Sequence, residues 1–260
     1  MEPDTLRALP KVAAENDLSF QRKKPRVWLV SVGYQAMRLA RWCVGPRRLL
    51  RACLVISWFF RRFALELCFD VFGDSFHDST MGVTDELLKE WIPQGGSVID
   101  VGCGHGRWCH ASASHASMVV GIDNNRKYIE TAKKNYQNPR VIFIYGRFPD
   151  DLDQHGLVGR TFDLALLIHV LEHIDDVDQL LQSVSRVTET VVVEVPDFES
   201  DSLNVVRHVY RSPYYSDADH VREYTLGLLR QHLERNQWNV VYSERRFGVI
   251  VMVAKVARSK

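Results

Sequence analysis

The sequence predicts an α/β fold built on a doubly wound, largely parallel sheet with helices on both faces. The main observation is that short, nearly continuous runs of Val, Ile and Leu alternate with helical stretches from Thr84 onward. Strands of a parallel sheet have this composition because both of their faces are buried. A glycine-rich turn directly follows the first of these runs, and an acidic residue ends the second. Both features lie at the carboxyl ends of strands, and ligands of open α/β sheets bind at the edge that these ends form.

The predicted elements follow one another along the chain. Thr84 is the expected N-cap of a helix over Asp85–Trp91, and Pro93-Gln94-Gly95-Gly96 separates it from the first strand. The expected strands are Val98–Val101, Met118–Ile122, Val141–Tyr145, Phe162–Ile168 and Val191–Val195, and the helices include Lys127–Asn135, Val177–Val187 and Leu226–Arg235. Two further β-rich runs, Asn239–Arg246 and Val249–Val256, predict a terminal antiparallel hairpin.

The most informative segment runs from Val98 to Arg107 and reads VIDVGCGHGR. A strand enters a glycine turn, and a helix is expected to open at Trp108. Glycine at such a turn lets bare backbone N–H groups approach a ligand that a Cβ would hold away. Asp123 ends the next apolar run, about twenty residues further on, where a carboxylate can accept hydrogen bonds from ribose hydroxyls.

The spacing departs from the G-x-G-x-x-G dinucleotide fingerprint, and the segment Asp100–Gly106 instead resembles the first motif of class I S-adenosylmethionine-dependent methyltransferases. The resemblance covers roughly residues 84–257. It implies a seven-stranded, doubly wound (Rossmann-like) sheet with a terminal antiparallel hairpin. It also implies that the turn lines the methionine end of S-adenosylmethionine and that Asp123 holds the ribose. The cofactor-binding residues expected on this basis are Asp100, Gly102, Cys103, Gly104, Gly106, Asp123, Asn124, Gly146, Arg147 and His169.

The adenine pocket departs from the family pattern. Relatives commonly have an acidic residue after the third strand, whereas Gly146 and Arg147 stand there in this chain. Backbone contacts or Asp150 are the expected substitutes. Phe148 would either stack on the base or belong to the core.

Histidines gather around the expected end of the fourth strand. A helical turn beginning at His169 would place His169, Glu172 and His173 on one face, and His220 lies on the insertion after the fifth strand. The arrangement is similar to that of small-RNA 2′-O-methyltransferases and of ubiquinone-biosynthesis O-methyltransferases, except that His169 replaces a Glu of the former.

Three roles for these residues stay open. All four could hold a divalent metal, with Zn, Mn or Fe suited to imidazoles and Mg less so. His173 or His220, or His169 beside the methyl group, could act as a catalytic base without a metal. The residues could also be structural.

The N-terminal part differs in charge from the rest. Residues 1–75 hold 13 Lys/Arg against 7 Asp/Glu, so the remainder carries a net charge of −5 within a total of +1. We expect a poorly ordered tail over residues 1–24 and a basic amphipathic helical extension over 25–80, with helices near Val27–Val44 and Arg47–Phe72. This extension could pack as a cap on the domain formed by residues 81–260, touch a membrane surface, or do both.

Five cysteines without a C-x-x-C pair argue against a disulfide framework or zinc knuckle. No secretory signal is expected, and no apolar stretch is long enough to span a bilayer. The predicted location is the cytoplasm, with the inner face of the membrane as an alternative.

The sequence therefore predicts an S-adenosylmethionine-dependent methyltransferase that acts on a hydroxyl of a small, glycan or lipid-linked acceptor. Residues 197–225 form the expected lid over that acceptor. Two alternatives remain open, an RNA 2′-O-methyltransferase and a non-catalytic protein that only binds S-adenosylmethionine. The acidic domain and the lack of a recognisable RNA-binding module oppose the RNA alternative.

Overall fold

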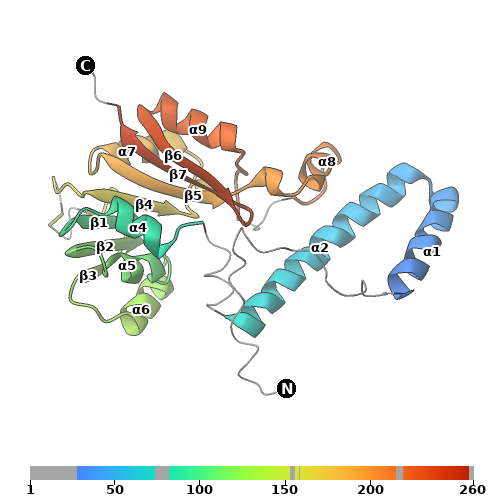
Figure 1. Ribbon diagram of the computed structural model, residues 1–260, viewed down its shortest axis with the longest axis horizontal. Helices are drawn as coiled ribbons and strands as arrows, with labels where there is room; N and C mark the ends of the chain where they lie inside the picture. Colours follow the sequence, from blue (N-terminus) through green and yellow to red (C-terminus); the bar gives the residue numbers. More distant parts are fainter. Residues whose placement is uncertain (1–27, 74–81, 153–155, 158, 215–218, 258–260) are drawn as a thin grey trace. The chain divides into compact units, whose positions relative to one another are not determined.

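The computed structural model describes residues 28–73, 82–152, 156–157, 159–214 and 219–257 (Figure 1). The expected tail over residues 1–24 lies outside this set. Internal contacts divide the chain into two units. One contains the N-terminal helices together with residues 202–214, and the other contains the remaining described residues from 82 onward. The lid expected over 197–225 is therefore divided between the two units.

The larger unit is built on a seven-stranded sheet in the order β3-β2-β1-β4-β5-β7-β6, which confirms the predicted fold class. The first five strands are parallel, and β7 and β6 are antiparallel to their neighbours. The strands are β1 (Ser97–Val101), β2 (Met118–Asp123), β3 (Val141–Tyr145), β4 (Leu164–Ile168), β5 (Thr190–Pro196), β6 (Trp238–Arg246) and β7 (Val249–Val256). Strand order reverses between β1 and β4, and ligands of doubly wound sheets bind at this switch point.

Helices cover the sheet as the apolar patterns predict. They are α4 (Asp85–Trp91), α5 (Arg107–Ser112), α6 (Arg126–Asn135), α7 (Val177–Ser185) and α9 (Leu226–Arg235), with short 3₁₀ turns η3 (Leu171–His173) and η4 (Phe198–Ser200). Side-chain oxygens of Thr84, Asn125, Asp176 and Thr225 cap four of these helices by accepting backbone N–H groups.

Two hydrophobic clusters flank the sheet. One joins alternate strand residues such as Ile99 and Val120 to Leu181 of α7 and Leu229 of α9. The other joins the intervening residues, such as Val98, to α4, α5 and α6. Because the strands are buried on both faces, the carboxyl ends of β1, β2, β3 and β4 are held rigidly at one edge, where the site residues lie.

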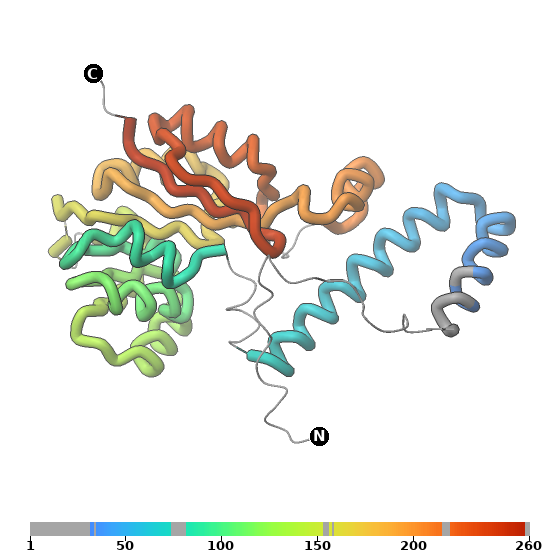
Figure 2. The backbone as a smooth tube through the Cα atoms, viewed as in Figure 1, coloured from blue at the N-terminus to red at the C-terminus, as the bar shows by residue number. Residues whose placement is uncertain are grey.

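The smaller unit consists of α1 (Trp28–Val44), α2 (Pro46–Phe72) and α8 (Leu203–Val209). Gly45, with φ of 83°, joins α1 to α2, and Pro46 opens α2 as expected from the breaker pair. Arg207 of α8 is almost fully buried and donates hydrogen bonds to Asn204 Oδ1 at 2.8 Å and to Ser57 Oγ of α2 at 3.1 Å. These bonds tie α8 to α2 (Figure 2 traces both segments). Among the described residues, no helix combines the length and the apolar character that crossing a bilayer requires.

Candidate functional site

The glycine turn leads directly from β1 into α5. Its three glycines all have positive φ, 73° at Gly102, 52° at Gly104 and 82° at Gly106, so each occupies backbone space that other residues rarely adopt. A Cβ on Gly102 would lie 2.8 Å from Val170, and one on Gly106 would lie 2.6 Å from the ring of Phe143. At Gly104, by contrast, a Cβ would meet no described atom within 4 Å. Two glycines thus permit close packing, and the middle one leaves the turn open.

Asp123 lies at the end of β2, beside this turn. Its Oδ2 accepts the N–H of Gly104 at 2.8 Å, and its Oδ1 accepts the N–H of Asn125 at 2.7 Å. A carboxylate held by two backbone donors keeps one orientation and has lone pairs left for further donors. The structure therefore brings together Asp123 and the turn, as the sequence predicts for residues at the ends of neighbouring parallel strands.

Asp100 lies beneath the turn and is buried, with 2% of its surface exposed. Burial raises the pKa of Asp100 to about 7. The hydrogen bond from Cys109 lowers this pKa in part, and the negative charge of Asp123 raises it further. Cys109 Sγ donates to Asp100 Oδ2 at 3.2 Å. Burial raises the pKa of the Cys109 thiol well above its usual value, so it stays protonated and able to donate. Among the described residues, no cation contacts this carboxyl.

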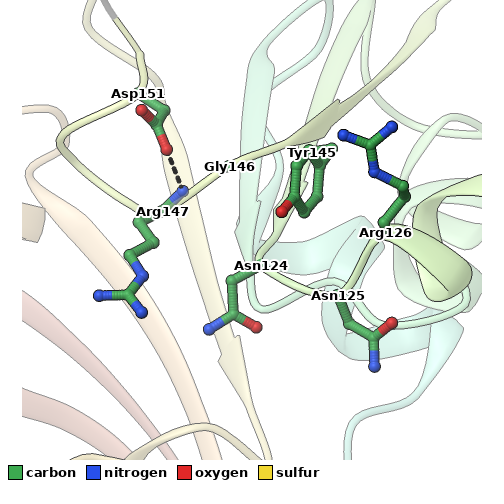
Figure 3. A pocket seen from close by; sticks show the side chains of 7 residues that line it. All are labelled: Asn124, Asn125, Arg126, Tyr145, Gly146, Arg147 and Asp151. Atoms are coloured by element: carbon green, nitrogen blue, oxygen red, sulfur yellow. Dashed lines mark hydrogen bonds between the residues drawn. The ribbon is translucent and has the colours of Figure 1, made fainter.

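A pocket of 460 Å³ lies at the ends of β2 and β3, and Figure 3 shows the side chains that line it. Three of the predicted cofactor residues contribute to it, namely Asn124, Gly146 and Arg147. The other lining residues, Asn125, Arg126, Tyr145 and Asp151, were not singled out from the sequence. The volume is within the usual range for small-ligand sites.

Asp151, the residue after the Asp150 that the sequence analysis names for the adenine pocket, lines this pocket. Its Oδ2 accepts the N–H of Arg147 at 2.7 Å (Figure 3). A Cβ on Gly146 would lie 2.7 Å from Asp151 Cβ, so the glycine lets the acidic side chain approach the chain after β3. Asp150 is exposed. Phe148 packs against the hydrophobic core and does not line the pocket.

His169 follows β4, and the prediction that a helical turn begins there is wrong. Its φ is 54°, and the 3₁₀ turn starts only at Leu171. The reason is that the backbone N–H of His169 still donates to Glu194 O of β5 at 2.9 Å, so the residue continues the sheet before the chain reverses. His169, Glu172 and His173 consequently do not share one helix face.

The ring of His169 instead links two carboxylates. Nδ1 lies 3.0 Å from Glu172 Oε1, and Nε2 lies 3.0 Å from Glu194 Oε1. Burial alone would lower the pKa of His169, but the hydrogen bonds and negative charges of these two fully buried glutamates outweigh it and raise the pKa to about 10. Glu194 was missed from the sequence, although a single carboxylate inside the run Thr190–Pro196 is a signal that a buried partner exists.

Three of the four predicted metal ligands come together. One ligand atom each of Glu172, His173 and His220 lies within 4.8 Å of the others. His169 is outside this group, because its two ring nitrogens face Glu172 and Glu194. Nδ1 of His220 lies 2.9 Å from Glu223, and Nδ1 of His173 lies 3.4 Å from Asp219. Carboxylates behind imidazoles in this way orient them for work at the other nitrogen.

A family model described as a methyltransferase domain matches residues 79–243. The ubiquinone biosynthesis O-methyltransferase of Mesorhizobium japonicum is 36% identical over 86 residues, 33% of this chain and 33% of that protein. The enzyme of the same name from Coxiella burnetii is 28% identical over 90 residues, 35% of this chain and 38% of that protein. The two matches thus span only 33 and 38% of the relatives' own lengths.

A solved structure supports the fold. The S-adenosylmethionine-dependent methyltransferase of Methanosarcina mazei superposes with a TM-score of 0.51 over 65% of this chain and 96% of that chain, at 16% sequence identity. At this identity the likeness concerns the fold.

The link between His169 and the two glutamates predicts a pH-dependent stability. The pKa of His169 is about 10 in the folded protein and 6.5 in the unfolded chain. The contribution of this link to the free energy of unfolding is therefore complete below pH 6.5 and is lost as the pH rises through 10. We expect His169→Gln to lower the free energy of unfolding by about 2–3 kcal/mol at pH 6, since it leaves buried carboxylates without their cation while a third of the ring is exposed. The loss should shrink toward pH 10. Urea unfolding at several pH values measures it.

The control is His208→Gln, which changes an exposed histidine in the smaller unit. A loss at His169→Gln that is equally large at pH 6 and pH 10 would contradict the charged link.

Proposed function

We propose that this chain, which belongs to the methyltransferase domain family, transfers a methyl group from S-adenosylmethionine to a hydroxyl of a small, glycan or lipid-linked acceptor. The observation that carries the proposal is the open glycine turn with the Asp123 carboxylate fixed beside it. S-adenosylmethionine supplies an activated methyl group when bound. The protein's part is therefore to bind, to orient the acceptor and to remove its proton.

The residues around the turn fit the cofactor's chemistry in sequence. Asp123 has carboxylate lone pairs for ribose hydroxyls. The pocket that holds Asn124, Gly146 and Arg147 offers the space beyond the ribose for the base, with Asp151 as a carboxylate for its amino group. Asp100 is a buried carboxyl that contacts no cation among the described residues, and it suits the ammonium of the methionine part.

Proton removal falls to the histidines near the end of β4. The rings of His173 and His220 lie 4.7 Å apart, edge to face, and each has a carboxylate at Nδ1. An imidazole oriented in this way can accept a proton from an alcohol, whereas an amine acceptor needs less help. This contrast favours a hydroxyl acceptor. His169 is assigned a positioning role, because both of its nitrogens face carboxylates.

Substitution of Asp123 tests the binding part of the proposal. Asp123→Asn removes the carboxylate that would accept hydrogen bonds from the two ribose hydroxyls. We expect the dissociation constant for S-adenosylmethionine to rise by at least about tenfold. Isothermal titration calorimetry gives this constant. Asp150→Asn is the matched control, since it removes an exposed carboxylate that does not line the pocket. Equal affinity in both variants, or no binding by the wild-type protein, would refute the assignment.

A metal ion held by the same residues is the alternative to a histidine base, since an imidazole nitrogen that ligates a metal cannot also accept the proton, and one observation favours it. Oε2 of Glu172 is buried and finds no hydrogen-bond partner among the described residues. One carboxylate oxygen of Glu172 and one ring nitrogen each of His173 and His220 lie within 4.8 Å of one another. Such a donor set fits Zn, Mn or Fe better than Mg. The residues Glu172, His173 and His220 would hold the ion, which would lower the pKa of a coordinated hydroxyl.

Metal content tests this alternative with a readout that is independent of activity, and turnover gives a second one. Protein purified without chelators should contain one of these metals. His220→Ala should lower the affinity of the protein for the metal ion at least about tenfold, and turnover should fall in parallel. Elemental analysis and metal titration measure the effect, with His208→Ala as control. Should the wild-type protein contain no more metal than His220→Ala, the group acts without an ion.

A further inference from the structure

One face of α2 carries a row of exposed apolar side chains. Their spacing of three and four residues places them along a single side of the helix. We call this set the aromatic stripe; it comprises Ile56, Phe59, Phe60, Phe63 and Leu67, with exposed fractions of 50, 58, 62, 49 and 44%. Phe59 stacks on Phe63 with ring centroids 6.5 Å apart, and it meets Phe60 edge-on at 5.7 Å. A patch of this kind on a helix signals an interaction site.

The aromatic stripe is distinct from the face that α2 buries within its own unit. Leu54 is 1% exposed, and Ser57 Oγ accepts a hydrogen bond from Arg207 of α8. At about 100° per residue, these two positions point away from the centre of the stripe. The smaller unit therefore has its own packed face, and the stripe is an additional apolar surface on the same helix.

The charge around the stripe indicates what it binds. Residues 28–73 contain seven arginines, no lysine and only two acidic residues, Glu66 and Asp70. On the helical circumference Arg48 and Arg62 border one side of the stripe, and Arg61 lies beyond its other side. Both acidic residues lie in the last two turns, and Arg62 pairs with Glu66 at 3.2 Å. The first four turns of α2 are therefore purely basic in their charged residues.

We propose that α2 lies along an anionic lipid surface, with the aromatic stripe at the boundary between headgroups and acyl chains. Aromatic and aliphatic side chains enter that boundary, while arginine guanidinium groups bind lipid phosphates. None of the described helices is long and apolar enough to span a bilayer, and the proposal concerns contact with the surface. A second copy of this chain fits less well, because joining two stripes would bring two arginine-rich surfaces together. The proposal does not depend on methyl transfer.

Vesicle flotation of the full chain tests the proposal. The protein should float with vesicles of phosphatidylcholine and phosphatidylglycerol, and much less with vesicles of phosphatidylcholine alone. Added salt should weaken the binding, because it screens arginine from phosphate. Arg47→Gln/Arg48→Gln removes two exposed charges and should lower binding on the order of tenfold or more.

The stripe itself is tested by Phe59→Ser/Phe63→Ser, which should lower binding to the anionic vesicles by at least about tenfold. The matched control is Val241→Ser/Phe247→Ser, which removes two side chains that are 44 and 52% exposed in and beside β6 and should bind as the wild type does. Circular dichroism and a thermal unfolding scan verify that each variant is folded.

Three results would overturn the proposal. The wild-type protein could remain unbound with both kinds of vesicle. The stripe variant and its control could float equally well. Light scattering could also show a wild-type dimer that Phe59→Ser/Phe63→Ser converts to a monomer without any change in flotation, which would assign the stripe to a second copy.

Discussion

The hydrogen bond from the Gly104 N–H to the Asp123 carboxylate connects the ends of β1 and β2, beside the point between β1 and β4 where the sheet reverses its order. It can form only because β1 and β2 are parallel and in register, with Asp100 opposite Gly121 and Val101 opposite Ile122. The site depends on this pairing, since it fixes a carboxylate beside the one glycine of the turn whose outer side is open. Burial of both strands on both faces then keeps the pair in place.

A second buried network lies beside the proposed catalytic histidines. Glu194 of β5 faces His169 through Oε1 and accepts the N–H of Val83 through Oε2 at 2.5 Å. One carboxylate thus joins the fifth strand, the residue after the fourth strand and the segment before α4. Glu172 shares His169 from the other side and also belongs to the group with His173 and His220. We infer that the imidazolium of His169 fixes Glu172, and through it the geometry of the proposed catalytic histidines.

Much of this arrangement follows from the sequence, because parallel strands have an apolar composition and their carboxyl ends meet at one edge. That rule predicts the nearness of Asp123 to the glycine turn and of Asn124 to Gly146. It fails where placement depends on a local backbone path. The left-handed conformation of His169 arises from a hydrogen bond to β5 that no spacing reveals.

Contacts between distant segments are equally hidden from the sequence. Asp151 reaches the pocket because Gly146 lacks a Cβ, a contact that propensities do not encode. Arg207 and Ser57 are 150 positions apart, and nothing in the polar segment around α8 indicates that it belongs with the N-terminal helices. The boundaries of the strands were predictable, whereas these polar partners were not.

We infer that the ammonium of S-adenosylmethionine supplies a cation beside Asp100, where the described residues place none. Burial raises the pKa of Asp100 to about 7, with a smaller lowering by the Cys109 hydrogen bond and a further rise from the charge of Asp123. The free protein therefore carries a proton on Asp100 at pH 6. Calorimetric titration with S-adenosylmethionine at pH 6, in buffers of different ionisation enthalpy, should show the release of nearly one proton. The affinity should rise on the order of tenfold between pH 5.5 and pH 7. Asp100→Asn should show neither effect. Binding by the wild-type protein without proton release, and with equal affinity across this range, would contradict the account.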